Sequence, residues 1–323
     1  MDLLGWSIVI IPILLILGIA IYSRRFIRGV ADYLAAGRVA GRYVISVSGL
    51  ESALGVITLV AAVEVNYQTG FALSFWTNIS IPLGALLALT GYCSYRFRET
   101  KALSLGQFLE MRYNRPFRVF ASGLRTVSEM LTNMIGPAVA ARFFIYLLGI
   151  PHHFHFCGME LPTFALVMIT TIILSLVIIW TGGMIALIIT DCIQGLMSYP
   201  IFVIFTIFVL THFSWSSEIV PVMMDRVTGE NFLNPYDIQS LRDFNLFALV
   251  VTIFNRILNQ ASWAGGGSDR SGRTPHEQKM AGILGTWRSG FGYIMCILIA
   301  VAVITTLTHI HYAVQAKTIR TEL

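Results

Sequence analysis

Two apolar segments of this sequence carry polar residues whose chemistry suits the binding of an ion or a small solute. In residues 43–66, a carboxylate stands among small and hydroxyl-bearing residues: Ser46, Ser48, Gly49, Glu51, Ser52 and Gly55. In residues 244–264, four polar side chains stand close together and are followed by three consecutive glycines. The polar residues are Asn255, Arg256, Asn259 and Gln260. Membrane proteins retain such residues at membrane depth for a task, and transporters hold ions and substrates at interrupted helices.

The composition places these segments in a membrane. Of 323 residues, 56% are hydrophobic and only 12% are charged, with a mean hydropathy of +0.73. A soluble domain carries about 25% charged residues, so the composition excludes a soluble enzyme, a disordered chain and a coiled coil. Apolar runs of about 20 residues recur along the chain, each long enough to cross the hydrocarbon core. We therefore predict an all-α polytopic membrane protein.

The apolar runs predict about eight transmembrane helices. They lie near residues 3–22, 43–66, 70–95, 119–149, 162–181, 184–211, 244–264 and 288–308. Most of the 22 Lys and Arg residues fall in or beside alternate connecting segments, 23–42, 96–118 and 265–287. By the positive-inside rule these segments are cytoplasmic, which predicts a multi-pass protein of the inner or plasma membrane with its amino terminus outside. The excess of basic over acidic residues therefore reflects membrane topology and does not indicate nucleic-acid binding.

The sequence lacks the patterns of the common catalytic and metal centres. It contains no phosphate-binding loop, no His-Glu-x-x-His zinc pattern and no nucleophile elbow. The four cysteines lie far apart without Cys-x-x-Cys spacing, so neither a zinc site nor a disulfide framework is indicated. We expect a protein that is not an enzyme and holds no structural metal.

Several segments, in order along the chain, resemble motifs of the sodium:solute symporter family, which includes the sugar, proline and pantothenate cotransporters. They are Asp32-Tyr-Leu-Ala-Ala-Gly-Arg38, Ser46 to Gly55, Ser104-Leu-Gly-Gln-Phe-Leu-Glu-Met-Arg-Tyr113, Gly182-Gly-Met-Ile-Ala-Leu-Ile-Ile-Thr-Asp-Cys-Ile-Gln194 and Asn259-Gln260. The segment from Gly182 to Gln194 is the most specific. One departure is that Gly265-Gly266 stands where the family has a Gln-Arg pair.

The resemblance implies a leucine-transporter-like fold built from two inverted five-helix repeats. It predicts one transmembrane domain over residues 1–323, with an extra first helix and inner loop at 1–42 and the first repeat at 43–211. An outer loop follows at 212–243, and 244–323 begins the second repeat. Eight helices are fewer than this fold requires, so we expect the fold to be incomplete and the chain to be carboxy-terminally truncated.

The resemblance also implies a site for the coupling ion, Na⁺, at the broken helix. Gly49 and Ser52 would offer oxygen ligands to sodium, Glu51 would lie near both ion and substrate, and Asp191 would line the inward ion path. For Glu51 the alternative is a solvated or protonated carboxylate in a packed helix. For Asp191 the alternative is a structural hydrogen bond to a neighbouring helix.

For the solute, the resemblance places Glu51, Asn259 and Gln260 at the binding site, and Trp263 is a candidate aromatic lid over it. Asn259 and Gln260 could instead serve as interhelical hydrogen-bonding groups, and Trp263 as an interfacial anchor. The function expected is sodium-coupled symport of a small organic solute by alternating access. Two alternatives are the membrane sensor module of a signalling protein and a non-functional transporter fragment. The identity of the solute and the choice between sodium and proton coupling stay open.

Overall fold

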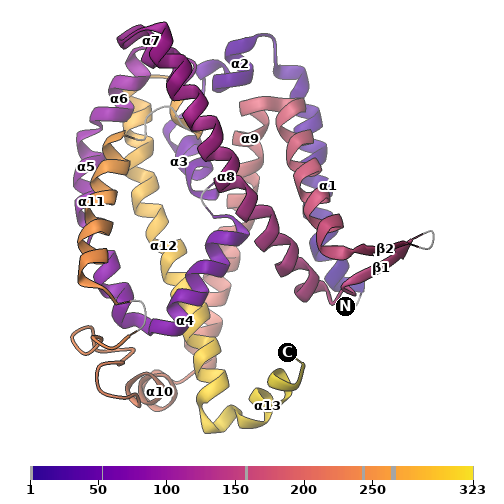
Figure 1. Cartoon of the computed structure of the whole chain (residues 1–323), viewed down its shortest axis with the longest axis vertical. Helices are drawn as coiled ribbons and strands as arrows, with labels where there is room; N and C mark the ends of the chain where they lie inside the picture. The colour runs from indigo at the N-terminus through magenta and orange to yellow at the C-terminus, as the bar shows by residue number, and fades with distance from the viewer. Residues whose placement is uncertain (1–2, 53, 157–158, 242–243, 263–266, 323) are drawn as a thin grey trace. The chain divides into compact units, whose positions relative to one another are not determined.

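The computed structural model describes the chain except residues 1–2, 53, 157–158, 242–243, 263–266 and 323 (Figure 1). Its helices are α1 (Leu3–Ser23), α2 (Val30–Ala35), α3 (Arg42–Glu51), α4 (Val56–Asn78), α5 (Ile81–Thr90), α6 (Tyr92–Glu99), α7 (Leu105–Arg112), α8 (Arg115–Leu148), α9 (Thr163–His212), α10 (Val220–Met224), α11 (Leu246–Ser262), α12 (Pro275–Thr308) and α13 (Ala313–Glu322). A hairpin of β1 (His153–Phe156) and β2 (Met159–Pro162) pairs antiparallel, with His153 opposite Pro162. The chain divides into two compact units.

The first unit comprises Met1–Ile57, Cys93–Gly195 and Ala264–Leu284. One hydrophobic cluster of this unit contains Ala36, Ala40, Ile45, Ile188 and Ala281. The second unit comprises Thr58–Tyr92, Leu196–Trp263 and Gly285–Leu323. Its larger core includes Val209, Ile219, Met223 and Ile304. Each unit thus buries its own apolar side chains.

Within the described residues, five helices are long and apolar enough to cross a membrane. Two of these stretches are too long for a single crossing of about 30 Å: the 44 residues Val56–Glu99, which comprise α4, α5 and α6, and the 50 residues Thr163–His212 of α9. Each contains a point where the helix reverses or bends, so each accounts for more than one predicted span. The long apolar helices thus agree with the expected multi-pass protein.

A helix break lies where the small residues predicted it. α3 ends at Glu51 and α4 begins at Val56. The intervening residues include Ser52 and Gly55, which favour non-helical backbone because serine competes for backbone hydrogen bonds and glycine has the greatest conformational freedom. The second predicted span is therefore an interrupted helix.

Gly183 makes the turn inside α9 that the sequence places between two spans. Its φ of 48° and ψ of −142° are non-helical. A Cβ at Gly183 would lie 2.7 Å from the Tyr33 backbone oxygen and 2.6 Å from its ring. Glycine is therefore required there both by backbone conformation and by close packing.

The second unit has a similar glycine turn at Gly70, where the sequence places the boundary between two spans. Gly70 has a φ of 58° inside α4, and a Cβ there would lie 2.5 Å from Phe232 Cβ. The following amides of Phe71 and Ala72 donate to the Phe232 carbonyl at 2.8 and 2.9 Å. The turn is thus held by a segment far along the chain.

Two features differ from the sequence expectation. The segment 265–287, expected as a loop, is helical from Pro275 onward, because Pro275 suits a first helical turn and Thr274 Oγ1 accepts from the Glu277 amide at 3.2 Å. The β1–β2 hairpin was not expected, since each strand has only four residues. Hydropathy finds apolar spans and misses polar helical turns and short strands.

Candidate functional site

The end of α3 is tied to α9 through one buried carboxylate. Asp191 Oδ2 accepts a hydrogen bond from Ser48 Oγ at 2.6 Å and another from Ser52 Oγ at 3.0 Å. Ser48 and Asp191 are buried, with 2% and 8% of their surface exposed. Ser48 lies in the last turn of α3 and Ser52 directly follows the helix, so the four-residue spacing directs both hydroxyls to the same side.

A second close approach follows one turn farther along α9. A Cβ at Gly195 would lie 2.5 Å from Val47 Cγ1 and 3.5 Å from both Cγ and Oε1 of Glu51. Only glycine lets α3 come this near without displacing a side chain. The carboxylate of Glu51, which is also buried, therefore lies against α9. The structure thus brings together Glu51 and Ser52, which the sequence assigns to the ion site, and Asp191, which it assigns to the inward ion path.

The electrostatic environment at the carboxyl-terminal end of α3 favours a cation. The carbonyl end of a helix carries partial negative charge, and α3 has no basic residue in its last turn. The buried side chains of Glu51 and Asp191 add two carboxyl groups at the same end. A buried carboxylate is stable only with hydrogen bonds or a neighbouring positive charge. The arrangement can hold a small cation through oxygen atoms.

The expected sodium ligands lie on the accessible side of the break. Gly49 and Ser52 are both exposed, and no atom lies within 4 Å of where a Cβ of Gly49 would stand. Ser52 donates its hydroxyl hydrogen to Asp191, which leaves the lone pairs of its oxygen able to face an ion. Of the last-turn carbonyls of α3, that of Ser48 accepts from the Ser52 amide at 3.0 Å and that of Glu51 from the Leu54 amide at 3.1 Å.

The beginning of α3 is also held within the same unit. The Arg42 guanidinium and backbone amide both donate to the Glu277 carboxylate, with Nε 3.0 Å from Oε2 and the amide 2.8 Å from it. This hydrogen bond to Glu277 raises the pKa of the Arg42 guanidinium. Nearby, Ala40 pairs with Gly272 as an isolated bridge, and Arg98 Nε donates to the Gly272 carbonyl at 2.6 Å. The start of α3 is thus fixed to the segment before α12.

Of the expected solute-binding residues, Glu51 belongs to the first unit, and Asn259 and Gln260 belong to the second. Asn259 and Gln260 lie in the last part of α11, and their side chains fall outside the described part of the structure. Trp263 lies outside the described residues. The assignment of these three residues to a solute site stays a prediction.

Two residues of the site were missed at the sequence level. The sequence pattern identifies Ser48 only as one of the small residues of the break, with no link to Asp191. It assigns no role to Gly195. The signal that could have found both is spacing: Ser48 precedes Ser52 by one helical turn, and Gly195 follows Asp191 by one.

The family model for the sodium:solute symporter family matches residues 33–260. This range contains α3, the helix break and Asp191. The chain belongs to the sodium:solute symporter family. The resemblance drawn from the motifs is thereby confirmed, and this family member is a multi-pass helical membrane protein.

A solved structure has a similar fold. It is a Na⁺-coupled sialic acid symporter in a substrate-bound, outward-open state, described as revealing a novel Na⁺ site. Its TM-score to this symporter-family chain is 0.69 at 20% sequence identity, and the match covers 98% of this chain. The likeness confirms the predicted helical, leucine-transporter-like fold class. Comparison with curated protein sequences gave no match.

This symporter-family chain spans 62% of the length of that solved transporter. The predicted orientation, with the amino terminus outside, rests on the distribution of basic residues alone. The solute and the transport activity of the whole protein are therefore treated below as proposals.

Proposed function

We propose that this chain takes part in sodium-coupled symport of a small organic solute by alternating access, alone or as part of a longer protein. The observation that carries the proposal is the pair of hydroxyls, Ser48 and Ser52, on the Asp191 carboxylate where α3 ends. Membership in the sodium:solute symporter family supports it. So does the fold, which is similar to that of a Na⁺-coupled symporter.

In this proposal Na⁺ binds at the interruption between α3 and α4. The Gly49 carbonyl and the Ser52 hydroxyl supply neutral oxygen ligands, and Glu51 supplies negative charge. Asp191 orients the Ser52 hydroxyl by accepting its hydrogen, and then takes part in release toward the inside. An interrupted helix suits this chemistry because its carbonyls reach an ion without the cost of burying a full charge.

The solute would bind near Glu51, Asn259, Gln260 and Trp263. A carboxylate and two amides suit hydroxyl or amine groups of a solute, because they offer both acceptors and donors. Binding of the ion and of the solute is then linked, so that each raises the affinity of the other by the same factor. The lipid bilayer surrounds the helices, and the ion would enter from the side of the amino terminus.

Binding of radioactive ²²Na⁺ to the purified full chain in detergent micelles tests the ion site. We expect saturable binding that excess K⁺ does not displace. Ser52→Ala and Asp191→Asn should each weaken it by about tenfold or more, since a hydrogen bond to a charged group contributes roughly 1.5–3 kcal/mol. Asp191→Asn keeps an oxygen that accepts from both serines, so it separates the loss of charge from the loss of packing.

Ser175→Ala is the matched control for these variants. Ser175 lies on the same helix, α9, is exposed, and donates to the Thr171 carbonyl at 3.0 Å. Its loss should leave ²²Na⁺ binding unchanged. Binding that is as tight in Ser52→Ala and Asp191→Asn as in the unchanged chain would show that the ion site lies elsewhere. Absence of saturable binding in the unchanged chain would contradict a sodium site formed by these residues alone.

A further inference from the structure

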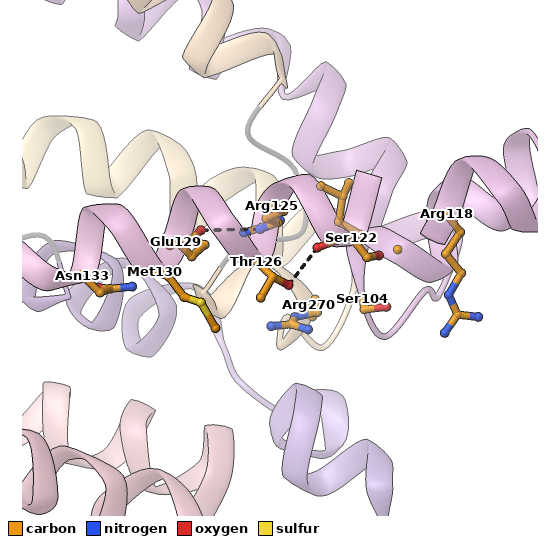
Figure 2. Close-up of a pocket in the computed structure, with 11 residues that line it drawn as sticks. Ser104, Arg118, Ser122, Arg125, Thr126, Glu129, Met130, Asn133 and Arg270 are labelled. Carbon is orange, nitrogen blue, oxygen red and sulfur yellow. Dashed lines mark hydrogen bonds and ion pairs between the residues drawn. The ribbon is translucent and has the colours of Figure 1, made fainter. Parts of the chain in front are cut away.

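A polar cavity of about 630 Å³ lies in the first unit between α7, α8 and the segment Gly267–Arg270. Figure 2 shows the side chains that line it. Among its described lining residues are three arginines, Arg118, Arg125 and Arg270, and one carboxylate, Glu129. The lining therefore carries a net charge of +2, three positive charges less one negative charge.

The arginines keep hydrogen-bonding capacity beyond their protein partners. Arg125 Nε lies 3.5 Å from Glu129 Oε1 in a pair whose side chains are 40% and 55% exposed. Arg118 pairs with Glu110 in a similarly exposed ion pair. Exposed pairs of this kind contribute little free energy and exchange partners easily. Since a guanidinium has five donors, Arg118 and Arg125 can each also serve an anion.

Hydroxyls and a helix amino terminus complete the lining. Ser104 caps α7, its Oγ accepting from the Gln107 amide at 3.1 Å, and the first-turn residues Leu105 and Gly106 border the cavity. The amides of a first helical turn have no intrahelical carbonyl partners and attract anions. On the α8 side, Ser122 adds a hydroxyl group, while the Thr126 hydroxyl donates to the Ser122 carbonyl at 2.8 Å.

Gly106 keeps this part of the cavity open. A Cβ there would lie 2.9 Å from Ser122 Oγ and 3.7 Å from Arg118 Cγ. A larger residue at this position would therefore push against the hydroxyl and the guanidinium stem that line the cavity. The close approach of α7 to α8 brings the serine, the arginine and the first-turn amides around one space.

We propose that this cavity binds a phosphate group, carried either by the headgroup of an anionic phospholipid or by free phosphate. Arginine forks, hydroxyls and helix amides are the donors that phosphate oxygens accept from. The basic segments around the cavity are those that the charge distribution predicts to be cytoplasmic, where basic pockets between transmembrane helices receive anionic headgroups. On α8, Leu124, Val127 and Leu131 are exposed and offer apolar surface for acyl chains.

Two arms distinguish the sources of the phosphate. In the first, the full chain is purified in an uncharged detergent and given phosphatidylglycerol or phosphatidylcholine, and retained lipid is counted by native mass spectrometry. In the second, inorganic phosphate is titrated into the same preparation by calorimetry at constant ionic strength. Preferential retention of phosphatidylglycerol supports a lipid headgroup, and saturable binding of inorganic phosphate supports free phosphate. Failure of both arms overturns the proposal.

Two substitutions, one removing a positive charge and one removing a negative charge, test whether phosphate binds in this cavity. Arg125→Gln should weaken binding about five- to tenfold, as expected for the loss of one charge-assisted contact. Glu129→Gln should strengthen it by about threefold, because it removes a negative charge from the lining and releases Arg125. A misfolded variant does not bind more tightly, so the gain in Glu129→Gln cannot come from damage to the fold.

Arg24→Gln is the matched control. Arg24 is exposed and lies outside the cavity lining, so its loss changes the net charge equally and should alter binding by less than about twofold. Equal effects of Arg24→Gln and Arg125→Gln would overturn the proposal, since they would indicate adsorption to the basic surface. Weaker binding in Glu129→Gln would overturn it as well.

Discussion

Arg42 and Glu277 join the first residue of α3 to the first turn of α12 through several hydrogen bonds to one carboxylate. The Arg42 amide donates to Glu277 Oε2 at 2.8 Å, and Nε lies 3.1 Å from Oε1 and 3.0 Å from Oε2. At its other end, α3 is tied to Asp191 through Ser48 and Ser52. The helix that carries the proposed ion site is therefore held at both ends within the first unit.

The Arg42–Glu277 pair should stabilise the fold modestly and in a salt-dependent way. Its side chains are 32% and 21% exposed, so solvent ions screen the attraction in part. We expect Arg42→Gln and Glu277→Gln each to lower the Tm by at most about 2–4 °C, and the double variant to lower it no further. Thermal unfolding at low and high NaCl measures this. Additive losses in the double variant would show that the two side chains act independently.

Replacing Ser48 should destabilise the chain more than replacing Ser52. Ser48 is 2% exposed, so Ser48→Ala leaves the buried Asp191 with a single described hydroxyl donor and should cost about 1–3 kcal/mol. Ser52 is exposed, and water can replace its hydroxyl. Denaturant-induced unfolding in detergent micelles compares the two variants. A larger loss in Ser52→Ala would contradict the structural role given to Ser48.

A methyl group at Gly195 should separate α3 from α9. In Gly195→Ala the new Cβ would lie 2.5 Å from Val47 Cγ1, and such overpacking costs about 1–3 kcal/mol. Val47→Ala in the same chain should restore most of the loss. The matched control is Gly49→Ala, where nothing lies within 4 Å and helix propensity favours alanine by about 1 kcal/mol. Equal unfolding free energies for Gly195→Ala and the unchanged chain would contradict the close contact.

The turn inside α9 should not tolerate a side chain at Gly183. Its φ is 48°, and a Cβ would meet the backbone oxygen of Tyr33 at 2.7 Å, so a change of rotamer cannot relieve the clash. We expect Gly183→Ala to cost at least about 1–3 kcal/mol. Gly285→Ala on α12, with nothing within 4 Å, should be neutral or stabilising. Thermal unfolding followed by tryptophan fluorescence measures both. A Tm for Gly183→Ala equal to that of the Gly285→Ala control would contradict this account of the turn.

The parts of the fold that depend on local chemistry could be predicted from the sequence. The break after Glu51 and the turn at Gly183 both follow from small residues whose backbone conformations are encoded nearby. The membrane spans follow from apolar runs of sufficient length. Motif resemblance assigns Ser52 to the ion site and Asp191 to the inward ion path, and the structure brings the two into hydrogen-bonding contact.

The contacts between distant segments could not be predicted in the same way. Ser48 and Asp191 are 143 residues apart, and Arg42 and Glu277 are 235 apart. No local pattern specifies which serine of the break reaches the carboxylate or which acid meets Arg42. The cavity between α7 and α8 could not be predicted either, because its lining comes from three separate segments. The spacing of Arg125 and Glu129 indicated their ion pair, but not the space beside it.

The four-residue spacings on α3 and α9 determine how these two helices can move. A slide of one turn, about 5.4 Å, would place Val44 and Ser48 opposite Asp191 and leave one hydroxyl where there are now two. In the other direction α3 has no further turn, because the helix ends at Glu51, so only Ser52 would remain opposite Asp191. Gly195 would meanwhile face a different set of side chains. Translation along the helix axis is thus opposed at every step, whereas tilting the two helices together preserves all of these contacts. Any opening at this site should therefore proceed by joint rotation of α3 with the part of α9 that carries Asp191 and Gly195.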